Sequence, residues 1–290
     1  MTVTASMVKE LRERTGLGMM ECKHALTEAG GDIELAIENM RKSGQAKAAK
    51  KAGRVAAEGA VLARISDGSG LLIEINSETD FVARDANFLQ FADKVVTRAL
   101  ELKVNQVEDL LNVSIEKIGG MTIEEARQAL ILKIGENIQV RRISSVNAPV
   151  LGSYVHNGSI GVLVGLVGGS EELARDLAMH IAANSPMVVN PTDVPEVVRN
   201  KEREIFLAQV QDSGKPKEIM EKMVEGRMRK FLSEVSLVDQ PFVKNPDIKV
   251  SDLLKNAGAV VQQFIRFEVG EGIEKETIDF AKEVMAQVNK

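Results

Sequence analysis

One short stretch of this 290-residue chain carries side chains that could act together on another molecule. After the apolar run LLIEIN the sequence turns polar, and Phe81 stands there with Asp80 immediately before it. An aromatic ring in such a setting either folds back under the following helix as part of the core or stays exposed. An exposed ring beside a carboxylate can enter a pocket of a binding partner as a hot spot. The residues alone slightly favour the core position, so both alternatives stay open at this point.

The sequence lacks the short motifs that carry nucleotide binding or hydrolysis in other proteins. It contains no phosphate loop GxxxxGK[ST], no dinucleotide fingerprint GxGxxG, no nucleophile elbow GxSxG and no HExxH. The histidines His24, His156 and His180 stand far apart, and His180 falls in an amphipathic helical pattern where a hydrogen-bonded structural role is expected. Cys22 is the only cysteine, so no thiolate cluster is available. We predict that the protein is not an enzyme and uses no metal, cofactor or small-molecule substrate.

Composition narrows the class of protein. The formal net charge is −5, 27% of the residues are charged, and only 3% are aromatic with no tryptophan. Nonspecific nucleic-acid binding needs a basic face, and base stacking needs aromatic rings. The longest apolar run, residues 160–167, is shorter than the roughly 20 residues that span a bilayer, and the start lacks the pattern of a secretory signal. We expect a soluble cytoplasmic protein without membrane contact and without a direct nucleic-acid partner.

Residues 3–44 are predicted to form three short helices. Two glycines within residues 15–20 interrupt the first helix, Gly30-Gly31 ends the second, and Asp32 caps the third. A bundle of this size usually presents a face to a partner. The cationic run RKSGQAKAAKKAGR, residues 41–54, then predicts a polar linker, with continuation of a helix as an alternative, and its composition favours a solvated tether over specific contact with RNA.

From residue 56 the pattern becomes that of strands. We predict one hairpin around Asp67–Gly70, from AAEGAVLARIS and GLLIEIN, and a second around Asn157-Gly158, from LGSYVH and SIGVLVGLV. Each hairpin is followed by an amphipathic helix, at residues 87–102 and 171–184, and by a returning strand, IQVRRISSV and VVQQFIRFEV. The repeated order predicts a duplicated α+β unit.

An antiparallel helical hairpin is predicted to interrupt the second unit. Residues 195–212 are helical, Pro216 in the turn SGKPKE suits a first helical position, and a second helix with a methionine-rich apolar stripe follows. Packing of the two helices on each other explains the stripe best, and docking to a partner is the alternative. A further short amphipathic helix is predicted after Gly272.

These patterns predict an α+β chain in five parts. They are a three-helix domain with its basic linker at residues 1–54, a first core subdomain at 55–145, a second at 146–192 and 233–270, the inserted hairpin at 193–232, and a C-terminal helical module at 271–290.

Two segments resemble the signatures of the elongation factor Ts family. LRERTGLGMMECKHAL, residues 11–26, is similar to the first signature, and EINSETDFVARD, residues 74–85, to the second. The resemblance continues in the family's order through GGDIELAIENMRKSG, KIGENIQVRR, SGKPKEIMEKMVEGRMRKF and FIRFEVGEGIEK, and so covers nearly the whole chain. Ser77 departs from the family, where many members have cysteine, but the following residues 79–82 match.

The resemblance implies a fold, a partner and a set of contact residues. The family has an N-terminal domain similar to ubiquitin-associated domains, two related core subdomains, a projecting helical hairpin and a C-terminal module. Its partner is the GTPase elongation factor Tu, from which it expels GDP so that GTP can bind. The resemblance assigns a wedge, which enters between two helices of the partner and disturbs its Mg²⁺ site, to Thr79, Asp80, Phe81 and Val82. It assigns further partner contacts to Arg12, Met19, Met20, Ile134, Gly135 and His156.

Two rival functions belong to other classes. An RNA-binding protein would use the basic run 41–54 and would lose affinity steeply with added salt. An enzyme with an unrecognised carboxylate site would show turnover in the absence of any GTPase. The acidic net charge and the missing motifs disfavour both.

Overall fold

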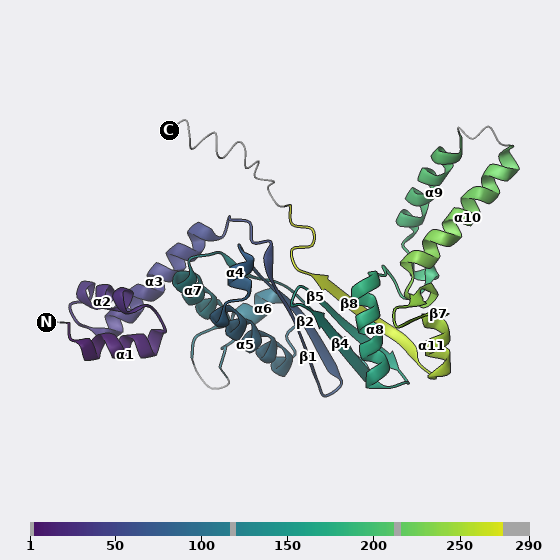
Figure 1. Ribbon diagram of the computed structural model, residues 1–290. Helices are drawn as coiled ribbons and strands as arrows, with labels where there is room; N and C mark the ends of the chain where they lie inside the picture. The colour runs from purple at the N-terminus through teal and green to yellow at the C-terminus, as the bar shows by residue number, and fades with distance from the viewer. Residues whose placement is uncertain (1–2, 117–119, 212–215, 275–290) are drawn as a thin grey trace.

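The computed structural model describes residues 3–116, 120–211 and 216–274, and it confirms the predicted α+β class (Figure 1). Two small antiparallel sheets form the middle of the molecule, each with three strands. Helices at the N-terminus lie at one end, and a pair of helices projects from the other end (Figure 1). The predicted helix after Gly272 lies outside the described residues.

The N-terminal helices are α1 (Ala5–Thr15), α2 (Met19–Glu28) and α3 (Ile33–Lys51). Asp32 caps α3 by accepting the Leu35 N–H at 3.0 Å, and Gly16 ends α1 in the left-handed region at φ 67°. The three helices bury one apolar cluster, built from Val8, Leu11, Leu17, Cys22, Ala25, Leu26, Ala29, Ala36 and Met40.

The basic run does not form a solvated tether. Most of it, up to Lys51, continues α3, which packs against α7 (Ile123–Ile134). Ala48 is buried in the core of the first sheet, and Arg41 forms an ion pair with Glu125 of α7. The helical alternative is therefore the one observed, because the small residues between the lysines let α3 approach α7.

The first sheet has the strand order β1-β2-β3. Its strands are β1 (Glu58–Ser66), β2 (Ser69–Ser77) and β3 (Ile138–Asn147). The first hairpin turns through two residues, Asp67 at φ 49° and Gly68 at φ 72°, instead of the four predicted. Helix α5 (Ala86–Leu102) contributes Phe88, Phe91, Ala92, Val95, Val96 and Ala99 to the core cluster of this sheet, and α6 (Val107–Leu111) and α7 add to it.

The second sheet repeats this arrangement with the strand order β4-β5-β8. Its strands are β4 (Val150–His156), β5 (Ile160–Val167) and β8 (Val260–Glu268), and α8 (Glu171–Asn184) covers it. The two sheets meet closely: a Cβ at Gly161 of β5 would lie 2.3 Å from the Val61 side chain of β1. The Val61 N–H also donates to the Gly158 carbonyl at 2.7 Å.

The projecting pair consists of α9 (Glu196–Gln211) and α10 (Lys217–Val235), which lie side by side after the short 3₁₀ helix η1 (Pro191–Asp193) (Figure 1). Pro216 is the N-cap of α10, one residue before the predicted position. Val224 is buried and Met220, Met223 and Met228 are half-buried, as expected if the stripe packs on α9. Several short elements escaped prediction, among them β6 (Pro241–Phe242), β7 (Asn245–Lys249) and α11 (Val250–Asn256).

His180 has the structural role that its pattern predicted. Its ring is fully buried on α8, where Nδ1 accepts the Val243 N–H at 3.1 Å. The proton therefore sits on Nε2, which donates to the Gln240 side-chain oxygen at 2.9 Å. Burial lowers the pKa of His180, against the opposing hydrogen bond to Gln240, so the neutral ring is favoured.

Glu74 is a fully buried carboxylate in the middle of β2. A β-bulge on β3 leaves Arg141 as an extra residue opposite Glu74, so that two successive arginines reach one carboxylate. Arg141 and Arg142 donate to it at 3.0 and 2.5 Å, and the Gly270 N–H and the Asn76 amide donate at 2.8 and 3.0 Å. Burial raises the pKa of Glu74, but these four donors outweigh it and the net shift is downward.

Candidate functional site

Phe81 lies on a single helical turn between β2 and α5. This turn, α4 (Asp80–Ala83), leaves the Phe81 side chain exposed, with 82% of the residue surface accessible. Its neighbour Val82 is 8% accessible and belongs to the core cluster of the first sheet. The turn thus buries Val82 in the core and leaves the larger Phe81 side chain exposed to solvent. The core-plug alternative for Phe81 is wrong.

Thr79 caps this turn and is itself held from outside. Its hydroxyl accepts the Val82 N–H at 3.4 Å. Both its N–H and its hydroxyl donate to the Glu136 carboxylate, at 3.0 and 2.8 Å. Beside these bonds the Asn137 N–H donates to Glu78 at 2.6 Å, so that residues 78–79 and 136–137 form a hydrogen-bonded seam. The base of the turn is therefore fixed by hydrogen bonds to charged acceptors, which are stronger than bonds between neutral groups.

Two carboxylates flank the turn. Asp80 forms an ion pair with Arg84 at 3.1 Å, and its side chain remains 47% exposed beside Phe81. Asp85 caps α5 through the N–H groups of Asn87 and Phe88. The hydrogen bond from the Asn87 side chain, together with those backbone donors, lowers the pKa of Asp85 despite partial desolvation. The exposed ring therefore has an accessible carboxylate next to it.

Ile134 and Gly135 lie beside this turn, because Glu136 follows them directly. Gly135 ends α7 in the left-handed region at φ 88°, and its carbonyl accepts a hydrogen bond from Lys51 of α3. His156 stands at the exposed end of β4, where the Tyr154 hydroxyl lies 3.0 Å from its Nδ1. Strand β1 links the Phe81 turn to the region of His156. It contacts α4, and its Val61 N–H donates to the Gly158 carbonyl in the β4–β5 turn.

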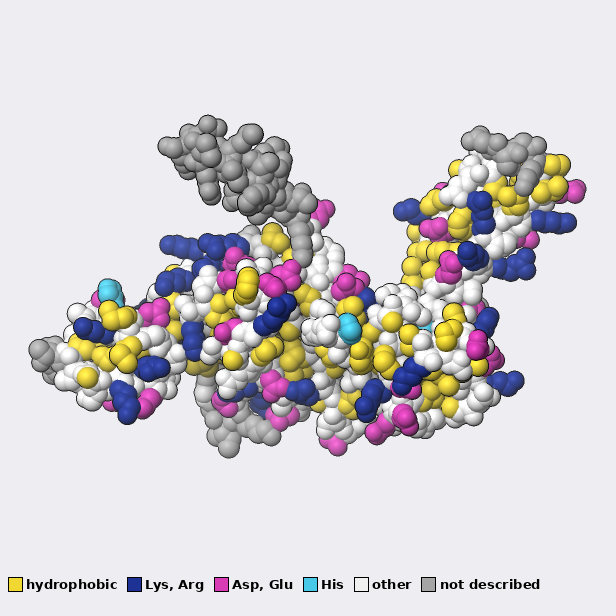
Figure 2. Space-filling view, viewed as in Figure 1, with side chains coloured by type: hydrophobic (Ala, Val, Ile, Leu, Met, Phe, Trp, Pro, Cys, Tyr) yellow, Lys and Arg dark blue, Asp and Glu magenta, His cyan; other side chains and the backbone are white. Residues whose placement is uncertain are grey.

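Arg12, Met19 and Met20 belong to a second exposed area. Met19 and Met20 begin α2 and are 58% and 74% accessible, and Arg12 is exposed on α1. These helices form one end of the molecule, whereas α4 lies over the first sheet (Figure 1). Hydrophobic side chains gather on the visible face of the N-terminal helices (Figure 2). The predicted contact residues therefore occupy two areas rather than one pocket.

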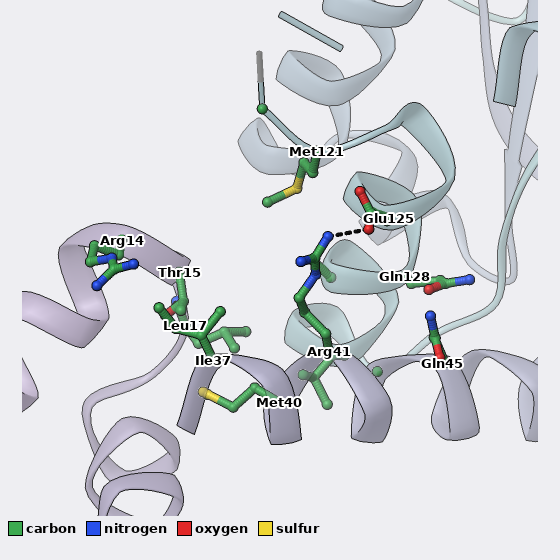
Figure 3. Close-up of a pocket in the computed structure, with 14 residues that line it drawn as sticks. Arg14, Thr15, Leu17, Ile37, Met40, Arg41, Gln45, Met121, Glu125 and Gln128 are labelled. Carbon is green, nitrogen blue, oxygen red and sulfur yellow. Dashed lines mark hydrogen bonds and ion pairs between the residues drawn. The ribbon is translucent and has the colours of Figure 1, made fainter. Parts of the chain in front are cut away.

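A cavity of about 270 Å³ lies between α3, α7 and the turn after α1 (Figure 3). The Arg41–Glu125 ion pair crosses it, and Leu17, Met40 and Met121 contribute apolar surface. None of the sequence-predicted contact residues lines it. Within the described ranges no cluster of three or more His, Cys, Asp or Glu side chains suits a metal ion. No helix in that part of the chain is long and apolar enough to cross a membrane.

Sequence reasoning missed Glu78 and Glu136, which hold the Phe81 turn. A partial signal was present, because Gly135 ends a helix and places the next side chain at a defined angle. The pairing itself joins residues 57 positions apart, and periodicity carries no information on such contacts.

Comparisons with known proteins agree on one family. A family model described as elongation factor TS matches residues 78–271. Elongation factor Ts of Idiomarina loihiensis is 58% identical over 289 residues, covering 99% of this chain and 98% of that protein. Elongation factor Ts of Pseudoalteromonas atlantica is 58% identical over 288 residues, with the same coverage. Elongation factor Ts of Alcanivorax borkumensis is 60% identical over 283 residues, covering 97% of this chain and 99% of that protein.

Proposed function

The chain belongs to the elongation factor Ts family, and on that premise we propose that it binds GDP-bound elongation factor Tu in the cytoplasm and promotes release of GDP. GTP then takes the empty site and the factor dissociates. The protein is a translation elongation factor, and this role needs no catalytic residue in the chain itself. The observation that carries the proposal is the exposed Phe81 on a turn that is hydrogen-bonded to Glu136, within a chain that matches the family over nearly its whole length.

The proposed wedge consists of Thr79, Asp80, Phe81 and Val82. Phe81 supplies apolar area that becomes buried in the partner, while Val82 roots the turn in the core. GDP is held by phosphate contacts and by a Mg²⁺ ion that demands near-ideal octahedral geometry. An intrusion that shifts the ligands of this ion by about an ångström removes much of that hold, since Mg²⁺ tolerates little departure from octahedral geometry.

Exchange then follows from thermodynamic coupling. If the factor lowers the affinity of the GTPase for GDP, GDP must lower the affinity of the GTPase for the factor by the same ratio. The nucleotide-free complex is therefore an intermediate that binding of either GDP or GTP can dissociate. Excess GTP drives it forward, and no covalent step is required.

The two exposed areas suggest a division of labour. We propose that Arg12, Met19 and Met20 dock on the partner's nucleotide domain, and that Ile134, Gly135 and His156 touch the partner elsewhere. The high exposure of both methionines supports docking, because a flexible thioether adapts to a partner surface.

Replacing both Met19 and Met20 with alanine is expected to raise the factor concentration for half-maximal GDP release by about tenfold, the scale of losing one moderate hot spot. The maximal release rate and the melting temperature should change little, because neither side chain is in the core. Leu35→Ala, an exposed apolar residue of the same three helices, is the matched control. An unchanged half-saturating concentration in the double variant would remove this area from the proposed interface.

Point substitutions suit this test better than removal of residues 1–54. Ala48 belongs to the core of the first sheet, and the Arg54 carbonyl accepts the Asn137 amide at 2.8 Å. A deletion would therefore disturb the seam that holds the Phe81 turn.

We also propose the five-part division of the chain predicted above, with the two sheets as copies of one unit. The shared strand order, in which the third strand pairs with the second, supports the duplication. Separate apolar clusters for the N-terminal helices and for each of the two sheets support three packed units, and Ala48 of the 1–54 part packs with the first sheet.

The RNA-binding alternative loses support from the contacts of the basic run. Arg41, Lys42 and Arg54 pair with Glu125, Glu38 and Glu78 of the same chain. Lys51 donates to the Gly135 carbonyl. Arg41 and Lys51 tie α3 to α7, Arg54 ties the following residues to Glu78, and Lys42 pairs within α3. Fewer cations of this run are then left for phosphate groups.

The proposed function is tested by loading elongation factor Tu with a fluorescent GDP and adding this chain in the presence of excess unlabelled nucleotide. Release should accelerate with factor concentration and then saturate. No acceleration at any concentration would refute the proposal.

A further inference from the structure

Glu136 and Glu78 reach across the seam between two distant segments at the base of the Phe81 turn. We propose that Glu136 is a positioning residue for nucleotide exchange: its carboxylate fixes the turn that presents Phe81 to the partner. This inference rests on the proposed function and adds to it a residue that makes no contact with the nucleotide.

Both oxygens of Glu136 are used on one residue. Oε2 accepts the Thr79 N–H at 3.0 Å, and Oε1 accepts the Thr79 hydroxyl at 2.8 Å. Glu78 reciprocates, because its Oε1 accepts the Asn137 N–H at 2.6 Å. Adjacent residues on each segment thus bind adjacent residues on the other, which fixes the position of Thr79 in more than one direction.

The turn needs this external support. Helix α4 has only four residues, and a single turn of helix is not stable alone because nucleation costs more than one hydrogen bond returns. Its own cap is long, at 3.4 Å from the Val82 N–H to the Thr79 hydroxyl. The Asp80–Arg84 pair is exposed and so contributes little. The Ser77 hydroxyl also donates to the Thr79 carbonyl at 2.9 Å. Among the side chains that hold the backbone leading into Phe81, Glu136 is the one that offers Thr79 a charged acceptor, and it does so twice.

Glu136 itself stands on a firm base. Gly135 before it takes a left-handed conformation that ends α7, and its carbonyl accepts Lys51. Asn137 after it is fully buried and donates its side-chain amide to the Arg54 carbonyl at 2.8 Å. The Glu136 carboxylate therefore has a fixed position in the free protein, and its hydrogen bonds fix the position of Thr79.

A fixed turn matters for the intrusion step more than for docking. Ordering a loop during binding costs conformational entropy, and a loop that is ordered beforehand avoids this cost. The docking contacts proposed on the N-terminal helices do not depend on Glu136, and the proposed contacts at Ile134 and Gly135 are held by α7 and by the Lys51 hydrogen bond. Its loss should therefore lower the maximal rate of GDP release while leaving the half-saturating concentration nearly constant.

The first arm of the test measures GDP release from elongation factor Tu at saturating factor. Glu136→Ala is expected to lower the maximal rate by about tenfold, the scale of losing hydrogen bonds to a charged group. Glu136→Gln should retain most of the rate, because the amide oxygen can accept the Thr79 N–H and the amide N–H can donate to the Thr79 hydroxyl. Asp193→Ala, which removes a carboxylate that accepts a loop N–H near α9, is the matched control and should match the wild type.

A double-mutant cycle separates positioning from a general structural effect. If Glu136 acts through Phe81, Glu136→Ala should add little to the loss already produced by Phe81→Ala. Additive losses in the cycle, or a full loss in the Glu136→Gln variant, would overturn the proposal.

The second arm needs no partner. The sequence has no tryptophan, so Phe81→Trp creates a single fluorescent reporter at the tip of the turn. Adding Glu136→Ala to this variant should lower the fluorescence anisotropy of that tryptophan, and Glu136→Gln should largely restore it. Unchanged anisotropy with Glu136→Ala would overturn the positioning role. If the wild type fails to accelerate GDP release while the anisotropy behaves as expected, the proposed function fails and the positioning of the turn stands.

Discussion

Replacing Phe81 with alanine is expected to lower the maximal rate of GDP release produced by this protein by about 30-fold, because we propose that the ring becomes buried at the intrusion step, where a hot-spot aromatic side chain contributes about 2 kcal/mol or more. The ring has no comparable role in the folded chain, since 82% of its residue surface is accessible. The free energy of unfolding should therefore stay within about 0.5 kcal/mol of the wild type. Stopped-flow release of fluorescent GDP and urea unfolding measure the two quantities.

Phe88 provides a matched comparison seven residues further along the chain. It is the same residue type, but it is fully buried on α5. Phe88→Ala should cost roughly 3–5 kcal/mol of stability, as for other large-to-small changes in a core. If Phe81→Ala behaved like Phe88→Ala and lost folding together with exchange, the wedge interpretation of Phe81 would be wrong.

Replacing Glu74 with alanine is expected to destabilise the fold by about 3 kcal/mol, the lower end of the range for breaking a buried ion pair. The lower end applies because Arg141 and Arg142 are 24% and 29% exposed and can regain some water. The Gly270 N–H, which donates to Glu74 at 2.8 Å, would lose its acceptor. Glu38→Ala, which removes an exposed pair with Lys42, should change stability by no more than about 0.5 kcal/mol.

The contribution of Glu74 should also depend on pH. The folded state lowers the pKa of this carboxyl below its ordinary value of 4.5. Its stabilising contribution is therefore fully present above that value and is lost as the pH falls through the lower, folded pKa. The deficit of Glu74→Ala relative to the wild type should shrink in acid. A deficit of equal size at neutral pH and well below the ordinary pKa of a carboxyl would show that the charge is not what matters.

Local signals in the sequence carried much of the fold. The turn residues Asp67-Gly68 and Asn157-Gly158 located both hairpins, because left-handed conformations in consecutive positions favour such pairs. The helix predicted at residues 171–184 has the same bounds as α8, since its cap and its apolar period agree. The short elements β6, β7 and α11 were missed, because two to seven residues give too little periodicity to detect.

Contacts of charged residues with partners far away in the sequence could not be predicted from local patterns. Glu74 interrupts an apolar run, and its sequence neighbours do not indicate burial between two arginines 67 and 68 positions away. Phe81 could be assigned to solvent from its own neighbours no better than to the core. The structure resolves this, because Val82 fills the core and Glu136 holds the cap. The partner contacts themselves rest on the family resemblance and remain predictions.

The most direct test of the central claim compares GDP release from elongation factor Tu with and without this protein, first in excess Mg²⁺ and then after chelation of the ion. If the Phe81 wedge acts through the partner's Mg²⁺ site, the protein should accelerate release strongly in Mg²⁺. Chelation should speed release from the GTPase alone, and the further acceleration by the protein should shrink. The same factor of acceleration in both conditions would contradict the account, because the protein would then be weakening GDP without acting on the ion.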